Sequence, residues 1–232
     1  MRKIRETMTR AYNSDCMEAM SQMSDNEFDL AIVDPPYGIG NTTTSKGNKK
    51  RKTLHERVTW NNRIPPDEYF RQIRRVSVNQ IIWGCNYFYP HIKETGRIIH
   101  FKDPFQTSDK IRFCLADLAS QTFDNRIEHF TYNWYGNTQG GKPNFKNTGI
   151  DTRIHPTQKP VALYKWLLKK YAKEGDKILD THLGSGSSRI AAYDMGFDFT
   201  GYETDEDYFK AHELRYVNHI RQGSLFEPKE MY

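Results

Sequence analysis

Short apolar runs alternate along the chain with longer stretches in which apolar residues recur every three or four positions. Runs of four to seven residues that are rich in Ile, Leu, Val and Phe predict buried strands. Five such runs are Asp29–Val33, Gln80–Trp83, Arg97–Phe101, Lys177–Asp180 and Phe197–Glu203. Arg10–Asn13 and His129–Trp134 are weaker candidates. The pattern therefore predicts seven strands.

The stretches between these runs have helical spacing. Pro66–Val78 places Tyr69, Phe70, Ile73 and Val76 on one face, and Pro160–Tyr171 does the same with Leu163, Trp166, Leu167 and Tyr171. Two more helices are expected over Ser187–Met195 and Asp205–Ile220. Strands that alternate with helices predict an α/β layer structure with a mostly parallel sheet. A length of 232 residues fits a single domain.

Composition excludes several classes of protein. Charged residues make up 27% and hydrophobic residues 37% of the chain, and no apolar run approaches the ~20 residues that span a bilayer. The basic N-terminus leads into no apolar stretch, as a secretory signal would. The three cysteines are too scattered for a disulfide framework or a zinc site. We expect a cytoplasmic protein with reduced thiols, no membrane partner and no bound metal.

The net charge of +5 is concentrated in one segment. Residues 38–63 contain seven Lys or Arg residues and one acid, which gives +6 and leaves about −1 for the rest. Lys46, Lys49, Lys50, Arg51 and Lys52 form its centre. A basic loop of this kind suits contact with nucleic acid phosphates, because neutralised phosphates release counterions. The alternative is a solvated surface loop without a partner. A second irregular segment, rich in Asn, Gly, Thr and Lys, covers residues 136–153.

A glycine-rich turn follows the predicted strand Lys177–Asp180. The strand leads through Thr181-His182-Leu183 into Gly184-Ser185-Gly186 and then a helix, and Glu203 ends the next strand 23 residues after Asp180. Glycines let the backbone approach a nucleoside, the helix N-terminus presents free N–H groups, and the acid can accept both ribose hydroxyls. Gly-x-Gly alone is often only a tight turn, but this context favours nucleoside binding.

A second motif ends the strand Asp29–Val33. In Asp34-Pro35-Pro36-Tyr37 the two prolines fix the backbone and remove two N–H donors, which leaves carbonyl acceptors. Asp34 adds a carboxylate and Tyr37 a flat ring. Two acceptors and a stacking surface suit the exocyclic amine of a nucleobase. The alternative is a proline-rich turn that merely closes a strand.

Together these motifs resemble the β class of DNA amino-methyltransferases. Asp34-Pro35-Pro36-Tyr37 is similar to the family's catalytic motif, Gly184-Ser185-Gly186 to its cofactor motif, and His155-Pro156-Thr157-Gln158-Lys159-Pro160 to the segment between them. Their order is the permuted order of that class. The similarity spans about residues 12–216, and Ile81–Phe88 with the small size most resembles stand-alone or phage-borne adenine methylases.

The resemblance implies a fold, a reaction and a set of site residues. It implies a Rossmann-like domain with a seven-stranded sheet that transfers a methyl group from S-adenosylmethionine to the N6 amine of adenine in double-stranded DNA. Asp34 and the Pro35 carbonyl would accept the amine hydrogens beside Pro36, and Tyr37 would stack on the base. The cofactor residues would be Asp180, Gly184, Ser185 and Gly186 at the methionine, Glu203 at the ribose, Asp15 near the adenine, and Thr157, Gln158 and Lys159 over the methionine end.

The chain departs from the family at one place, since Asp180-Thr181-His182 stands where Asp-Pro-Phe is usual. Several rivals stay open: cytosine-N4 methylation, whose motif more often begins with Ser; RNA or protein amine methylation; a nucleotide-dependent oxidoreductase; and a cofactor-binding protein without activity. Ring-carbon cytosine methylation is set aside because no cysteine follows a proline. The short region 102–153 leaves either a simple target sequence or a homodimer for recognition.

Overall fold

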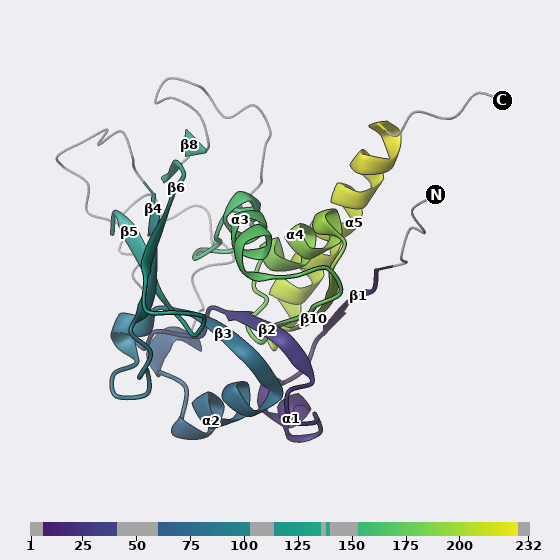
Figure 1. Cartoon of the computed structure of the whole chain (residues 1–232). Coiled ribbons are helices and arrows are strands. Elements are labelled where there is room, and N and C mark those ends of the chain that lie inside the picture. The colour runs from purple at the N-terminus through teal and green to yellow at the C-terminus, as the bar shows by residue number, and fades with distance from the viewer. Residues whose placement is uncertain (1–6, 41–59, 103–113, 136–137, 140–152, 227–232) are drawn as a thin grey trace, which may run out of the picture.

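The computed structural model describes residues 7–40, 60–102, 114–135, 138–139 and 153–226. An eight-stranded sheet runs through this part of the chain in the order β1-β10-β9-β2-β3-β5-β4-β6 (Figure 1). Its strands are β1 (Thr9–Tyr12), β2 (Phe28–Val33), β3 (Ser77–Trp83), β4 (Gly96–Phe101), β5 (Ala116–Gln121), β6 (Ile127–Thr131), β9 (Lys177–Asp180) and β10 (Asp198–Tyr202). A separate pair joins β7 (Trp134–Tyr135) to β8 (Thr138–Gln139). The helices are α1 (Cys16–Ser21), α2 (Asp67–Val76), α3 (Val161–Tyr171), α4 (Ser187–Met195) and α5 (Glu206–Phe226).

The predicted fold class is confirmed, but the predicted number of strands is wrong. Each of the seven expected strands overlaps an observed one, and the eighth is β5. This strand, Ala116-Asp117-Leu118-Ala119-Ser120-Gln121, contains few of the β-branched and aromatic residues that mark strands in a sequence. It forms because it pairs antiparallel with both β3 and β4, while all other pairings in the large sheet are parallel. Tertiary pairing therefore outweighs its weak local preference.

Side chains alternate along β2 and pack against helices on both faces of the sheet. Leu30 and Ile32 of β2 pack in one core cluster with Leu163 and Leu167 of α3, whereas Ala31 and Val33 pack in a second cluster with residues of α1 and α2. Figure 1 shows α3, α4 and α5 on one side of the sheet and α1 and α2 on the other. The predicted apolar faces of α2 and α3 both meet the core, and Tyr69, Phe70, Ile73 and Val76 are all buried.

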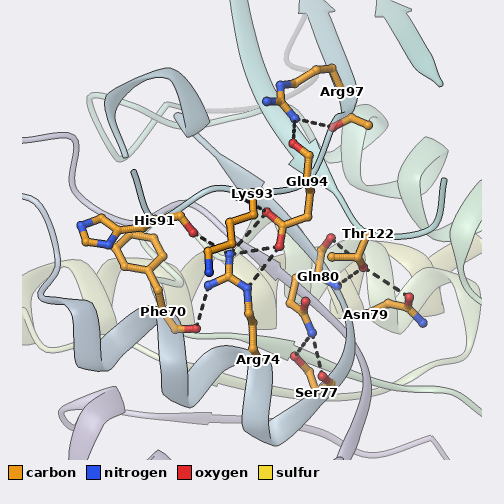
Figure 2. A network of polar contacts seen from close by, with 11 residues as sticks. Phe70, Arg74, Ser77, Asn79, Gln80, His91, Lys93, Glu94, Arg97 and Thr122 are labelled. Carbon is orange, nitrogen blue, oxygen red and sulfur yellow. Dashed lines mark hydrogen bonds and ion pairs between the residues drawn. The ribbon is translucent and has the colours of Figure 1, made fainter. Parts of the chain in front are cut away.

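A polar network fixes α2 beside the segment that joins β3 to β4 (Figure 2). The guanidinium of Arg74 lies 3.0 Å from the Glu94 carboxylate and donates to the backbone oxygens of Phe70 and His91. At the end of the helix, Gln80 donates to the backbone oxygen of Ser77 at 2.7 Å. These partly buried contacts hold α2 against the sheet at the amino ends of β3 and β4.

The sheet has a topological switch point between β2 and β9. These strands are neighbours, but the chain leaves β2 through α2 to β3 on one side and leaves β9 through α4 to β10 on the other. Because α2 and α4 cover opposite faces, the loops after β2 and β9 diverge and leave a crevice at the carboxyl ends of the strands. None of the helices in the described part of the chain has an apolar stretch long enough to cross a membrane.

Candidate active site

A cavity of about 480 Å³ opens at this switch point. Its walls come from the loops after β1, β2, β9 and β10, from the segment before α2 and from the segment before α3. Of the residues predicted to form the site, those that line the cavity are Asp15, Asp34, Pro36, Thr157, Gln158, Lys159, Gly184, Ser185 and Glu203. Residues from positions 15 to 203 thus meet in one place, as the two motifs required.

Glu203 organises the glycine-rich turn. One oxygen of its carboxylate accepts a hydrogen bond from the backbone N–H of Gly184 at 2.8 Å, and the other accepts from the N–H of Asp205 at 2.9 Å. Burial raises the pKa of Glu203 above its usual value, against the effect of these backbone donors. Gly184 has a φ of +50°, in the left-handed region that favours glycine. The acid and the turn therefore present one preformed surface to a ligand.

Asp180 and Gly186 lie behind that surface rather than in the cavity lining. The Asp180 carboxylate accepts from the Ser188 hydroxyl at 2.6 Å and from the His182 N–H at 3.0 Å. Burial raises the pKa of Asp180 to about 7. Gly186 caps α4 with a φ of +71°, and a Cβ there would lie 2.5 Å from the His212 ring. Asp180 and Gly186 therefore support the glycine-rich turn on the side away from the cavity.

Asp34 lines the same cavity just after β2, and each of its carboxylate oxygens has one donor. The Tyr37 hydroxyl donates to Oδ1 at 2.5 Å, and the Lys159 ammonium lies 2.5 Å from Oδ2. Burial, followed by the nearby Asp34 charge, raises the pKa of Tyr37 well above its usual value, so this phenol is a neutral donor. Lys159 is 5% exposed. The lysine that was expected at the cofactor thus contacts the candidate catalytic acid.

The Tyr37 ring is held by residues that the sequence had not marked. Asn61 accepts from the Tyr37 N–H at 2.8 Å, and Tyr87 stacks on the ring with centroids 4.9 Å apart. Gly84 has a φ of +74°, and a Cβ at this position would lie 2.1 Å from Tyr37 Cε1. The ring fits only because position 84 has no side chain. In the sequence, Gly84 directly follows the apolar run Gln80–Trp83, and this glycine is the feature that could have indicated the close contact. The buried Pro35 completes the turn.

The segment before α3 forms the rim of the cavity. The Gln158 side chain accepts from the Ile154 N–H at 3.0 Å, and its backbone oxygen accepts from the Trp134 indole at 2.6 Å. Thr157 lies against His155, with its N–H 3.3 Å from Nδ1. On the far rim Asp15 caps α1 by accepting from the Met17 N–H at 2.6 Å. The rim is therefore built from residues 154–158 and from the start of α1.

His182, the departure from the family pattern, lines the cavity as a neutral ring. Burial lowers its pKa to about 4, and its Nδ1 lies 2.9 Å from the Thr181 hydroxyl. Tyr69 contacts the ring edge-on at 5.3 Å and also bonds Thr181 at 2.7 Å. A packing role fits these surroundings, with Nδ1 beside the Thr181 and Tyr69 hydroxyls. The five basic residues Lys46, Lys49, Lys50, Arg51 and Lys52 lie outside the described residues.

Comparison with known proteins decides the family. Residues 82–214, more than half of the chain, match the N6/N4 family described as DNA methylase. The chain belongs to this family. The match includes the glycine-rich turn and His155–Pro160, and Asp34–Tyr37 precede it. The type II methyltransferase M.HpaI of Haemophilus parainfluenzae is 24% identical over 226 residues, covering 85% of this chain and 70% of that protein.

Two solved structures share the fold of this chain. The M1.HpyAVI–SAM complex has a TM-score of 0.55 at 17% identity and covers 90% of this chain and 100% of its own. The PvuII DNA methyltransferase, which is cytosine-N4-specific, has a TM-score of 0.57 at 11% identity, covering 97% and 89%. Proteins of this fold therefore include a cytosine-N4 enzyme, and the fold leaves the choice of base open.

Proposed function

We propose that this DNA methylase family member transfers a methyl group from S-adenosylmethionine to the N6 amine of adenine in double-stranded DNA. One observation carries the proposal: Asp34 and the Gly184–Gly186 turn border the same cavity, at the carboxyl ends of the neighbouring strands β2 and β9. A methyl donor on the turn and an amine at Asp34 would then be adjacent. Holding two reactants in this way lowers the entropic cost of their reaction.

S-adenosylmethionine is the methyl donor, and the cavity fits it. Glu203 would accept the ribose hydroxyls, since each of its oxygens keeps an acceptor site beyond its one backbone bond. Asp15 would lie near the cofactor adenine. Gly184, Ser185 and the rim residues Thr157 and Gln158 would contact the methionine part, with Asp180 and Gly186 supporting the turn. Bound there, the cofactor supplies an electrophilic methyl group on a sulfonium.

The target amine would bind to Asp34 beside the two donors that its carboxylate already has. The base must leave the duplex stack to reach the cavity. Asp34 and the Pro35 carbonyl would then accept its two hydrogens, which favours a pyramidal nitrogen and stabilises the positive charge that develops on it. Each Asp34 oxygen accepts from one donor, Tyr37 or Lys159, and keeps a second acceptor site, so the amine can bind beside these donors. Tyr87 covers one face of the Tyr37 ring, so a base that stacks there uses the opposite face or displaces Tyr87.

Adenine is favoured over cytosine by the first residue of the motif. Asp34 resembles the adenine-specific branch, whereas the cytosine-N4 branch more often begins with Ser. Cytosine-N4 methylation is the second candidate, because the cytosine-N4-specific PvuII enzyme shares the fold over 97% of this chain. Both reactions attack an exocyclic amine, and the same acceptors serve either. The DNA itself would be held in part by Lys46, Lys49, Lys50, Arg51 and Lys52, with the target sequence read by residues 102–153 or by a homodimer.

The experiment is mass analysis of nucleosides in DNA from cells that express the protein, with cells expressing the Asp34→Ala variant as the matched control. N6-methyladenine present only with the wild type supports the proposal. N4-methylcytosine in its place would show that the enzyme methylates cytosine-N4, the second candidate function. If both bases stayed at control levels while the purified protein bound S-adenosylmethionine, DNA amine methylation would be the wrong reaction.

A further inference from the structure

A pair of polar side chains that the proposed reaction does not use lies at the same edge of the sheet as Asp34. His100 is the next-to-last residue of β4, Asp117 is the second residue of β5, and the two are directly opposite each other in the sheet. The His100 ring is fully buried, and its Nδ1 lies 3.7 Å from the Asp117 carboxylate. Because β5 is antiparallel to β3 and β4, it begins where those strands end. Both residues are therefore at the carboxyl edge that carries the cavity.

The register of the sheet places Asp117 on the face that Lys159 covers. Side chains two positions apart share a face, so Asp117 shares one with Ala119, which is the partner of Trp83 at the end of β3. Trp83 and Ala119 both pack in the core cluster that contains residues of α3. Lys159 precedes α3, and its ammonium lies 5.1 Å from the centre of the Trp83 ring. Since the strand order is β2-β3-β5, this ammonium lies between Asp34, which follows β2, and Asp117.

The Asp117 carboxylate has two cationic neighbours. The Lys102 ammonium lies 2.8 Å from one of its oxygens. His100 contributes no charge near neutral pH, because burial lowers its pKa. Burial alone would raise the pKa of Asp117, but the imidazole and the ammonium groups of Lys159 and Lys102 hold it well below its usual range. Asp117 is thus a second anion beside Lys159, on the side away from Asp34.

We propose that Asp117 is a positioning residue for methyl transfer, and that it acts through Lys159. The inference rests on the transfer at Asp34 of the proposed function, and it holds for either target base. Positive charge develops on the amine at Asp34, and the adjacent Lys159 ammonium opposes that charge. A second carboxylate beyond the ammonium offsets part of this opposition.

Two further observations support this role. The Lys159 side chain is only 5% exposed, so a second anion offsets part of the cost of removing its charge from water. The Asp117 charge also reaches the Tyr37 hydroxyl, which donates to Asp34. The pKa of Tyr37 is raised by burial first, then by the charge of Asp34, and next by the charge of Asp117. The two carboxylates therefore act on the same groups.

The kinetic test compares variants of Asp117 in steady-state methyl transfer. Asp117→Asn keeps the shape of the side chain and removes its charge. We expect kcat to fall roughly 10-fold while the Kd of S-adenosylmethionine stays within about twofold, because the lost charge acts on the amine across Lys159. Asp117→Glu restores the charge and should recover most of the loss in kcat. Unchanged kcat in Asp117→Asn, or no recovery in Asp117→Glu, would overturn the assignment.

Asp194→Asn is the matched control. The Asp194 side chain is 19% exposed and that of Asp117 22%, and Asp194 also has a lysine partner, Lys165, at 2.7 Å. It lies near the C-terminal end of α4, the end remote from the glycine-rich turn. Its substitution should leave kcat within about twofold of the wild type, since its charge is far from the reacting amine. An equal loss in Asp194→Asn and Asp117→Asn would reduce the role of Asp117 to general stability.

A double-mutant cycle tests the contact with Lys159 without the reaction. Urea midpoints are measured for the wild type, Asp117→Asn, Lys159→Met and the double variant. Asp117→Asn should shift the midpoint less in the Lys159→Met chain than in the wild type, because one of its two cations is already gone. Equal shifts would show that Asp117 serves Lys102 alone and would overturn the assignment. A wild type that binds S-adenosylmethionine but transfers no methyl group would instead refute the proposed function, and with it the role of Asp117 in transfer, even if the cycle shows coupling.

Discussion

The buried Lys159 forms an ion pair with the partly buried Asp34, its ammonium 2.5 Å from the carboxylate oxygen that the Tyr37 hydroxyl leaves free. The two residues are 125 positions apart in the sequence. The pair joins the segment before α3 to the turn after β2 at the wall of the cavity. A charge in such a place is stable only while its partner remains.

Removal of Lys159 should therefore destabilise the fold more than removal of the whole pair. Lys159→Met leaves the partly buried Asp34 carboxylate with one remaining donor, and we expect a loss of about 1–3 kcal/mol in the free energy of unfolding in urea. Asp34→Asn combined with Lys159→Met should lose less than the single variant. The exposed pair of Arg71 and Glu68 is the control, and Arg71→Met should cost under about 1 kcal/mol. Additive effects of the two substitutions at 34 and 159 would contradict the coupling.

Gly84→Ala should displace the Tyr37 ring, since the added Cβ would lie 2.1 Å from a ring carbon. We expect methyl transfer to fall roughly 100-fold, the effect of misplacing a reacting group by about 1 Å. Gly40→Ala is a matched control, because Gly40 also has a positive φ of +68° but a Cβ there meets its nearest atom only at 3.8 Å. It should cost about 1–2 kcal/mol of stability from the backbone and keep most of the activity. Similar activities of the two variants would exclude the steric explanation.

His182 should make the protein less stable as the pH falls from about 6.5 to about 4. Its pKa is lowered to about 4 in the folded chain, so in this range the unfolded chain binds a proton that the folded chain does not. His182→Phe removes this proton and keeps a ring against Tyr69. Between pH 7.5 and pH 5 the variant should lose less stability than the wild type, by on the order of 1–2 kcal/mol in urea unfolding. Asp180, whose pKa is raised to about 7, has the opposite dependence and cancels in the comparison. Identical losses would show that the fold does not lower the pKa of His182.

Lys46, Lys49, Lys50, Arg51 and Lys52 are predicted to contact DNA phosphates. Replacement of all five with Ser should weaken binding to DNA of any sequence and flatten its dependence on salt, because the slope counts phosphate contacts at ~0.9 each. Affinity measured over a series of salt concentrations tests this, with S-adenosylmethionine binding as the control that should not change. Equal slopes for the two proteins would indicate that the segment is a solvated surface loop with no part in DNA binding.

The strands and motifs that could be predicted from the sequence are those with local signals. The runs that became β2, β9 and β10 are apolar and end in polar motifs, so both their burial and the position of Glu203 followed from pattern. β5 could not be predicted, because its Ala, Asp, Ser and Gln residues prefer no strand until β3 and β4 pair with it. Residues 102–153 were considered for target recognition, yet their described part includes β5 and β6 of the main sheet.

Contacts between distant residues account for what the sequence analysis missed at the site. Lys159 was assigned with its neighbours because Thr157-Gln158-Lys159 resembles a cofactor segment, and only the fold reveals that its ammonium reaches Asp34. Asn61 stands in a segment without periodicity, and its bonds to the Tyr37 and Gly40 backbone depend on a loop that returns to β2. Short-range patterns fix which elements form, but not which polar side chains meet across them.

The most direct test of the account separates catalysis at Asp34 from cofactor binding. Purified wild-type protein and the Asp34→Ala variant are given S-adenosylmethionine with a labelled methyl group and duplex DNA from cells that lack amine methylation. Label transferred to DNA and the Kd of the cofactor are measured for both. The account predicts that the variant loses transfer roughly 100-fold or more, since its charge-stabilising acceptor is gone, while the cofactor Kd changes by less than about threefold. Wild-type transfer by Asp34→Ala would contradict the assigned catalytic centre.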